Sequence, residues 1–202
     1  MASNGLDSIP DPGDPAPAYQ YVQGEAQLRG IELTMDIHPH PLDWLHFENS
    51  FSFVSGVNKS QSKNDSTKYL PFIPGPRLQS ELRANIKKLG GTLFNAFIKI
   101  EFNHFWEQDR VLLENGTETP TSSYSLWGMG IGTGVRNKKR LELFSFYFTV
   151  TNVLDKAYQH HLSRLKYAAE NPVTGRAGVF NMGRNFSVKI VVPVTFRKVG
   201  PG

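Results

Sequence analysis

The sequence LFNAFIKIEFNHFW, from Leu93 to Trp106, decides the fold class because its side chains alternate between apolar and polar. A period of two residues is typical of a β-strand, since successive side chains point to opposite faces of a sheet. We therefore predict a strand much longer than the ~5–6 residues usual in globular proteins. One predicted face carries Phe94, Ala96, Ile98, Ile100 and Phe102, and the other carries Asn95, Lys99, Glu101 and Asn103.

The same alternation recurs along the chain and predicts seven strands, or eight if a shorter segment is included. A change of phase near Gly30 predicts a β-bulge there. One segment alternates apolar residues with four glycines, which we interpret as lumen-facing residues that leave room for a plug or loop. The further strands are predicted at Ile31–Ile37, Trp44–Val57, Arg77–Lys87, Ser123–Arg136, Arg140–Asn152 and Arg184–Phe196, with Tyr19–Gly24 as the eighth; the glycines are Gly128, Gly130, Gly132 and Gly134.

The connections between these strands alternate in length. A transmembrane β-barrel has short periplasmic turns and long extracellular loops, and its tilted strands need about 9–11 residues to cross the bilayer. The pattern therefore predicts an all-β, antiparallel transmembrane β-barrel segment of about seven to eight long strands. The short connections are His38–Asp43, Leu89–Thr92 and Asn137–Lys139, and the long ones are Asn58–Pro76, Glu107–Ser122 and Val153–Gly183.

Composition narrows the function classes. The chain has 202 residues, 39% hydrophobic and 20% charged, which fits a folded protein. It has no Cys, which excludes disulfides, a thiol nucleophile and thiolate metal ligands. Ser125 and Ser163 have no nucleophile-elbow context, so we expect no enzyme. We also expect no cofactor, no metal site and no nucleic-acid partner, since the basic residues are spread along the chain.

Alternation does not reveal which face lies inside. A soluble barrel points its apolar face inward, whereas a transmembrane barrel points it at lipid. Stacked aromatic residues on the apolar faces favour the membrane arrangement. Trp44, Trp106 and Trp127 lie near predicted strand ends, as the aromatic residues of a membrane interface do.

Four short segments resemble TonB-dependent outer-membrane receptors. Thr151–Tyr158 is similar to the "N-L-F-D-K-x-Y" segment of that family, and His161–Tyr167 looks like the loop that follows it in one branch. Gly183–Phe186 resembles the "G-R-x-F" start of the last barrel strand, and Leu28–Glu32 resembles the "Y-G-x-E" strand. The four segments follow the family order, and the resemblance is taken to extend over nearly all of residues 18–197.

The resemblance implies a 22-stranded barrel in the bacterial outer membrane, filled by a plug and energised through TonB. It implies uptake of an iron-siderophore, haem, cobalamin or glycan. We assign residues 1–17 to an irregular Pro/Asp-rich segment like an extracellular loop, 18–197 to the C-terminal part of the barrel and 198–202 to a tail. No plug or TonB-contact segment is recognised, so the expected partners are outer-membrane lipid, the remainder of the barrel, the plug and a small-molecule ligand.

Five residues are candidates for contact with that ligand. Asn95, Lys99 and Glu101 belong to a polar row that faces either plug and solute or only solvent. His160 and His161 lie in a predicted extracellular loop, where they are haem ligands or an ordinary loop pair. Two other functions stay open: a soluble β-barrel binding module for a small apolar ligand, and a small self-closed structural barrel of the outer membrane.

Overall fold

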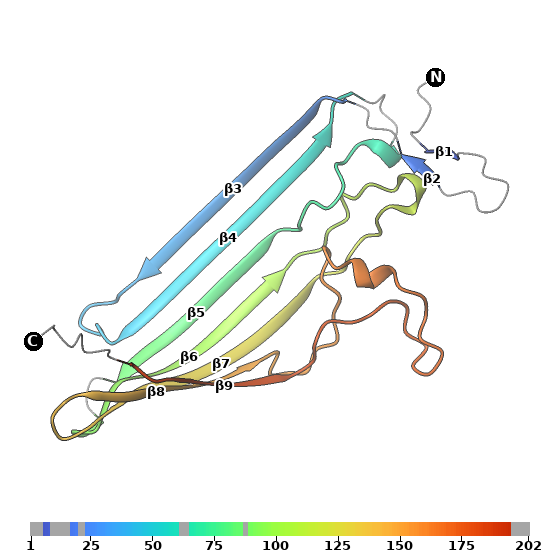
Figure 1. Cartoon of the computed structure of the whole chain (residues 1–202). Coiled ribbons are helices and arrows are strands. Elements are labelled where there is room, and N and C mark those ends of the chain that lie inside the picture. The colour runs from blue at the N-terminus through green and yellow to red at the C-terminus, as the bar shows by residue number, and fades with distance from the viewer. Residues whose placement is uncertain (1–5, 9–16, 20–22, 61–64, 87–88, 195–202) are drawn as a thin grey trace, which may run out of the picture.

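The fold is a single curved antiparallel sheet. The computed structural model describes all residues except 1–5, 9–16, 20–22, 61–64, 87–88 and 195–202. Seven strands follow one another in chain order across the sheet, so that each pairs with its sequence neighbours (Figure 1). They are β3 Ala26–Ile37, β4 Leu45–Asn58, β5 Arg77–Ile86, β6 Leu93–Phe105, β7 Tyr124–Arg136, β8 Glu142–Thr151 and β9 Asn185–Val191.

This sheet confirms the all-β antiparallel prediction, with strand bounds close to those expected. The described helical segments are three short 3₁₀ turns, η1 Asp65–Thr67, η2 Glu114–Gly116 and η3 Arg164–Tyr167. Within the described residues no helix is both long enough and apolar enough to span a membrane. The outer edges of β3 and β9 pair with no other described strand, so the sheet is open in the part of the chain described.

The N-terminal region differs from its prediction. A separate two-stranded sheet joins β1 Leu6–Ser8 to β2 Pro17–Tyr19, where we had expected irregular loop and, from Tyr19, an eighth barrel strand. The rest of the proposed eighth strand includes residues 20–22, which lie outside the described residues.

The predicted bulge at Gly30 is wrong, because β3 pairs with β4 in unbroken register from Ala26 to Ile37. The register shifts lie elsewhere: in β6, where Asn95 and Ala96 together face Thr133, and in β8, where Leu143 is the extra residue opposite β7. Asn95 adopts a left-handed conformation with φ 50°, as the first residue of such a bulge often does. The extra residue in β6 moves Phe94 to the face of Phe97, so its assignment to the face of Ile98 is also wrong.

The four glycines of β7 face the same side of the sheet as Lys99 and Glu101. Neighbouring side chains already occupy the space beside them: a Cβ atom on Gly132 would collide with Phe97, and one on Gly134 with Phe94. At Gly128 and Gly130 the neighbours are Glu101 and Lys99. The glycines therefore make room for β6 side chains, which corrects the prediction that they leave room for a plug or loop.

Strand β9 ends at Val191, five residues before the predicted end at Phe196. Pro193 has no backbone N–H to donate to a neighbouring strand, which accounts for the end of pairing nearby. Residues 195 and 196 lie outside the described residues.

The β6–β7 loop holds the largest fully buried side chains found in the described residues, Val111 and Glu118.

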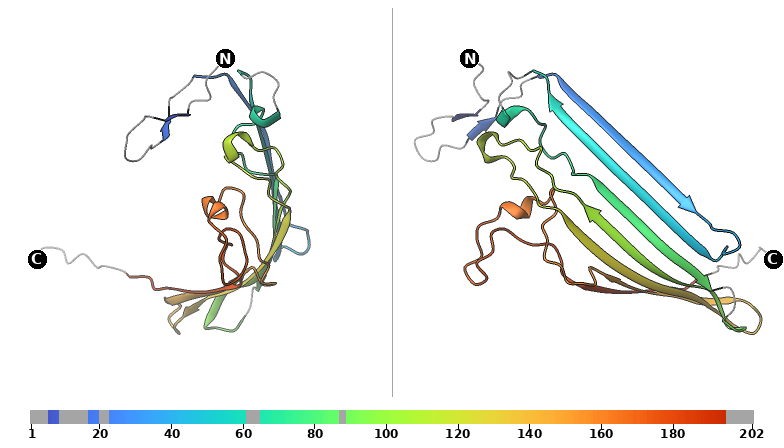
Figure 2. Two further views of the ribbon diagram at one scale, coloured as in Figure 1. Left: turned by 90° about the vertical axis from the view of Figure 1, so that its right-hand side faces the viewer. Right: turned by 180° about the vertical axis from the view of Figure 1, so that it is seen from behind.

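The sheet bends into an arc, and the long loops with η3 lie on its inner side (Figure 2, left). Ring contacts show which face is concave: Tyr158 and His160 of the β8–β9 loop pack on Tyr124 and Phe105. These two strand residues share their face with the Lys99 row. The polar face is therefore concave, and the apolar face is convex.

Candidate ligand-binding site

An aromatic cluster with one cation forms at the loop end of the concave face. The antiparallel register places Arg77 opposite Phe105, and Phe105 opposite Tyr124. The Arg77 guanidinium carbon lies 5.0 Å from the Phe105 ring centre, and the Phe105 and Tyr124 rings stack at 4.7 Å. The β8–β9 loop adds Tyr158, 4.8 Å from Tyr124, and His160, 5.6 Å from Phe105.

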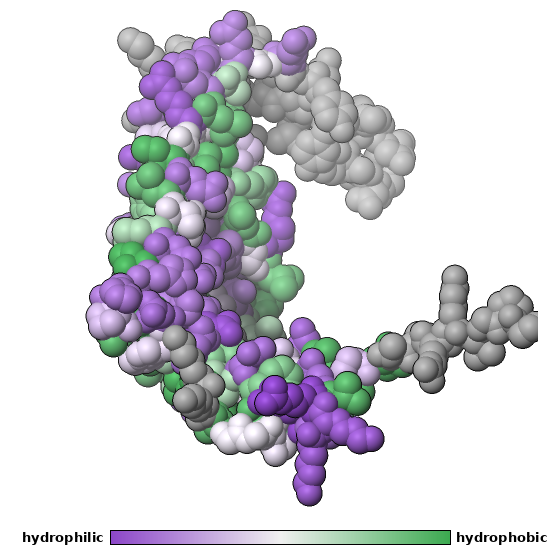
Figure 3. All heavy atoms as spheres, turned by 90° about the vertical axis from the view of Figure 1, so that its left-hand side faces the viewer, coloured by the Kyte–Doolittle hydropathy of each residue, from purple (hydrophilic) through white to green (hydrophobic). Residues whose placement is uncertain are grey.

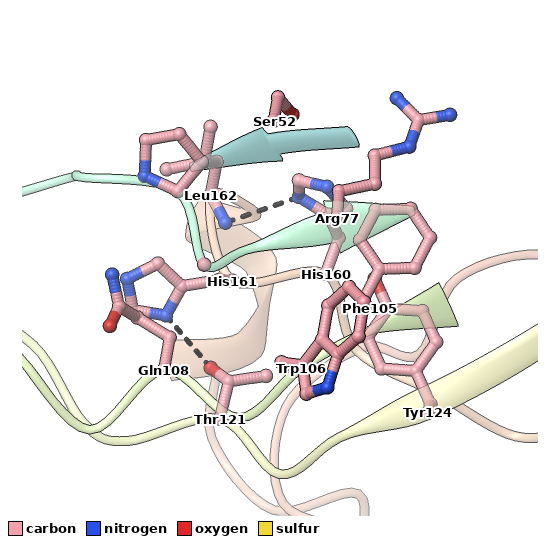
Figure 4. A pocket seen from close by; sticks show the side chains of 12 residues that line it. Ser52, Arg77, Phe105, Trp106, Gln108, Thr121, Tyr124, His160, His161 and Leu162 are labelled. Atoms are coloured by element: carbon pink, nitrogen blue, oxygen red, sulfur yellow. Dashed lines mark hydrogen bonds between the residues drawn. The ribbon is translucent and has the colours of Figure 1, made fainter. Parts of the chain in front are cut away.

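Four members of this cluster, Arg77, Phe105, Tyr124 and His160, line a cavity of about 270 Å³ between the sheet and the loops. Figure 4 shows Arg77, Phe105, Tyr124 and His160 around it, with Gln108 and Thr121 of the β6–β7 loop on the opposite side. The cavity is smaller than a typical drug-sized pocket of ~300–1,000 Å³.

The charge of the cavity comes from Arg77. Its Nη2 donates to the side-chain oxygens of Asn103 at 2.9 Å and Gln79 at 3.2 Å, which fixes the guanidinium, while Nε is buried without a partner. Burial, with the nearby Arg77 charge, lowers the pKa of His160, so this imidazole is neutral at pH 7. Burial raises the pKa of the Tyr158 hydroxyl, which is likewise neutral. A cation above neutral aromatic rings suits a planar or anionic ligand group.

Glu118 joins three loops behind this cavity. Its side chain is fully buried and accepts hydrogen bonds from the backbone N–H of Phe72 in the β4–β5 loop, at 2.8 Å, and of Leu112 in its own loop, at 3.1 Å. His161 Nε2 of the β8–β9 loop lies 3.5 Å from Glu118 Oε1. The second His161 nitrogen, Nδ1, is hydrogen-bonded to Thr121 Oγ1 at 2.9 Å. Glu118 therefore acts as an internal clasp for the loops that close the cavity.

The structure separates the five sequence-predicted site residues into three places. His160 and His161 line the cavity, although His161 is only 6% exposed and serves the loop clasp. Lys99 forms ion pairs with Glu81, at 2.9 Å, and with Glu101, so its charge is committed to two carboxylates of the sheet wall. Asn95 lies apart, in the bulge of β6.

The sequence analysis missed Arg77, Phe105, Tyr124 and Tyr158 as site residues. A signal was available for two of them: Phe105 and Tyr124 have the parity of the polar face, where a large aromatic side chain is unexpected. Their meeting with Arg77 depends on strand register, which alternation alone does not fix. In the described residues, no group of three or more His, Asp or Glu is placed to hold a metal ion.

The fold is similar to that of a solved structure described as "Copper transporter OprC". The two share 17% sequence identity with a TM-score of 0.66 over 87% of this chain. The match covers 25% of that transporter, so this chain spans about a quarter of its length. No protein-family model matches the sequence. No curated protein matches it either. At this identity the likeness concerns the fold.

Proposed function

We propose that this chain forms part of the wall of an outer-membrane β-barrel receptor that takes up a scarce small ligand in a TonB-dependent manner. The observation that carries the proposal is the apolar convex face. Large side chains there are half exposed at mid-strand, for example Ile100 at 47% and Met129 at 46%, and they follow one another across the sheet. In water such a surface would be costly, whereas lipid accommodates it.

The interface residues support the same placement. Trp106 and Trp127 lie toward the loop end of the convex face, and each is about 40% exposed. The His104 ring lies 4.5 Å from the Trp106 ring and its Nδ1 is hydrogen-bonded to Ser125 Oγ at 2.8 Å, while Phe102 contacts Trp127 at 4.7 Å. Polar side chains gather at the turn end of the strands, which faces the viewer in Figure 3. Aromatic residues flanking an apolar band are typical of a transmembrane barrel.

The mechanism in this proposal is binding without covalent chemistry. The long loops would face the outside, and the Arg77 cavity would contact part of the ligand, which belongs to the siderophore, haem, cobalamin or glycan class. Further strands would pair with the outer edges of β3 and β9, because backbone groups in hydrocarbon need partners. A plug would contact the charged concave row. The structural likeness to a transporter of this fold supports transport over a structural role.

Detergent dependence tests the proposal against a soluble binding module. We expect the purified full chain to stay monodisperse in detergent or lipid and to associate when both are removed. A chain that stays monodisperse in plain buffer would contradict the membrane placement. The soluble alternative also predicts that an apolar dye binds on the concave face, and therefore that Ser50→Trp, on this face, alters dye binding more than Met129→Trp does.

A further inference from the structure

A groove of about 300 Å³ interrupts the convex face near the turn ends of β5 to β8. Two small side chains, Ala96 and Thr133, form its floor. Their partners on the neighbouring strands are larger: Ile86 of β5 pairs with Ala96, and Phe146 of β8 pairs with Thr133. Ile98 and Ile131, one step further along the strands, form the upper wall. The β6 bulge produces this arrangement, because it sets Asn95 and Ala96 together against Thr133.

The groove is apolar in spite of the threonine. The Thr133 hydroxyl lies 3.3 Å from the carbonyl oxygens of Phe94 and Gly134, so its hydrogen-bonding capacity is used within the sheet. Leu89 and Leu93 form the lower rim, and Leu89 is 43% exposed. A long aliphatic chain is the ligand that such a surface accepts.

Three cations lie beside the lower rim. The β7–β8 turn carries Lys138, Lys139 and Arg140, all exposed, and the described residues hold no ion pair that involves them. Asn137 fixes the turn: its Oδ1 accepts the backbone N–H groups of Lys139 at 2.9 Å and Leu141 at 3.0 Å.

Two contacts connect this turn to the groove. Arg136 donates its backbone N–H to Thr92 at 2.9 Å and its Nε–H to Gly91 at 3.0 Å, which joins the β7–β8 turn to the β5–β6 turn that carries Leu89. The nearest acidic residue in sequence, Glu142, accepts a hydrogen bond from Ser145 at 2.6 Å on the concave side. Within the described residues, the three cations at the end of the apolar groove therefore form no ion pair with Glu142 or with any other carboxylate.

We infer that the groove and the Lys138–Arg140 turn form a binding site for an anionic phospholipid, with an acyl chain in the groove and the phosphate at the turn. The inference rests on the proposed membrane placement. Charge complementarity selects the occupant, because clustered basic side chains at a bilayer surface attract anionic headgroups. A free anion would not use the groove, and a second copy of this chain would not need the cations.

Native mass spectrometry of the full chain in a zwitterionic detergent tests the site. We expect phosphatidylglycerol to be retained about tenfold more than phosphatidylcholine. The triple variant Lys138→Gln, Lys139→Gln, Arg140→Gln should lose that preference. The matched control, Lys59→Gln, Lys68→Gln, Lys156→Gln, removes the same charge from the loop end and should keep it. Circular dichroism checks that each variant is folded.

A second pair of variants tests the acyl chain. Leu89→Gln should weaken retention of phosphatidylglycerol, whereas Leu165→Gln, an exposed leucine in η3, should not. Equal retention of the two lipids by the natural chain would overturn the inference. Complete displacement of phosphatidylglycerol by inorganic phosphate would also overturn it. So would a dimer of the natural chain that becomes monomeric in Leu89→Gln. These outcomes leave the membrane placement intact, because detergent dependence tests that placement separately.

Discussion

At the scale of single residues, Glu118 has the clearest structural role. A carboxylate that is excluded from solvent needs hydrogen-bond donors, and here two backbone N–H groups from different loops supply them. The same oxygen that accepts from Phe72 also lies nearest to His161. One side chain therefore joins the β4–β5 and β6–β7 loops by hydrogen bonds, and His161 of the β8–β9 loop packs beside it.

Replacement of Glu118 by Ala should loosen these loops without unfolding the sheet. Each buried N–H that is left without an acceptor lowers the free energy of unfolding by about 1–3 kcal/mol. We expect the Phe72 and Leu112 amides to lose much of their hydrogen-exchange protection, while amides of β6 and β7 keep theirs. Glu107→Ala, an exposed glutamate of the same loop, is the control and should change neither. Equal protection in Glu118→Ala would show that the clasp is not needed.

The loop packing should weaken in acid because of His161. Burial lowers the pKa of this residue from its usual 6.5, nearby Lys166 and His160 lower it further, and Glu118 opposes them. Below about pH 6.5 the unfolded state binds a proton that the folded state does not. The stabilisation is therefore complete above pH 6.5 and is lost as pH falls through the lowered pKa.

Hydrogen exchange of the loop amides between pH 7.5 and 5.5, corrected for intrinsic rates, measures this loss. His161→Gln should flatten the dependence, since its side chain does not titrate. His40→Gln replaces a highly exposed histidine in the β3–β4 turn and should leave the dependence unchanged. A dependence that survives in His161→Gln would assign it to another group, with His160 the first candidate, because burial lowers its pKa as well.

At the scale of elements, the Thr151–Tyr158 and Gly183–Phe186 segments contact each other in the structure. Asp155, from the Thr151–Tyr158 segment, accepts the backbone N–H of Arg184 at 2.8 Å, and Arg184 Nε donates to the Val153 carbonyl at 2.8 Å. Asn152 adds hydrogen bonds to both the N–H and the carbonyl of Lys156. The two segments therefore close the base of the β8–β9 loop.

Asp155→Ala should fray β9 from the sheet. The change removes the acceptor for the Arg184 N–H and puts Ala in a left-handed conformation, φ 54°, that it adopts poorly. We expect a loss of about 1–2 kcal/mol, seen as faster exchange in Asn185–Val191 and greater sensitivity to protease at the loop. Asp155→Asn keeps both an oxygen acceptor and tolerance of that conformation, so it should behave like the natural chain. Equal exchange rates in β9 for Asp155→Ala and Asp155→Asn would contradict the proposed role of Asp155 in holding β9 to the sheet.

At the scale of the whole molecule, the parts of the fold set by local pattern were predictable and the parts set by register were not. Alternation located all seven strands, because one apolar face must stay on one side of the sheet. Alternation predicted a bulge at Gly30, whereas the bulge lies at Asn95. A change of phase in the sequence also arises without a bulge, as it does in β3 at the edge of the described sheet. The Arg77 cavity could not be predicted, because it forms only when three strands and a loop are in their final register. The Glu118 contacts could not be predicted either, because no local sequence pattern indicates them.

The orientation of the two faces gives a test that involves the whole molecule. Ile100 lies at the middle of β6 on the convex face, opposite Leu82 and Met129. Arginine at the bilayer midplane costs about 2–4 kcal/mol, so Ile100→Arg should lower stability by that amount in urea unfolding from lipid vesicles. Ser50→Arg, between Thr34 and Gln79 on the concave face, should cost much less. The reverse order, with Ser50→Arg the more damaging, would mean that the concave face is packed and that the convex face meets water.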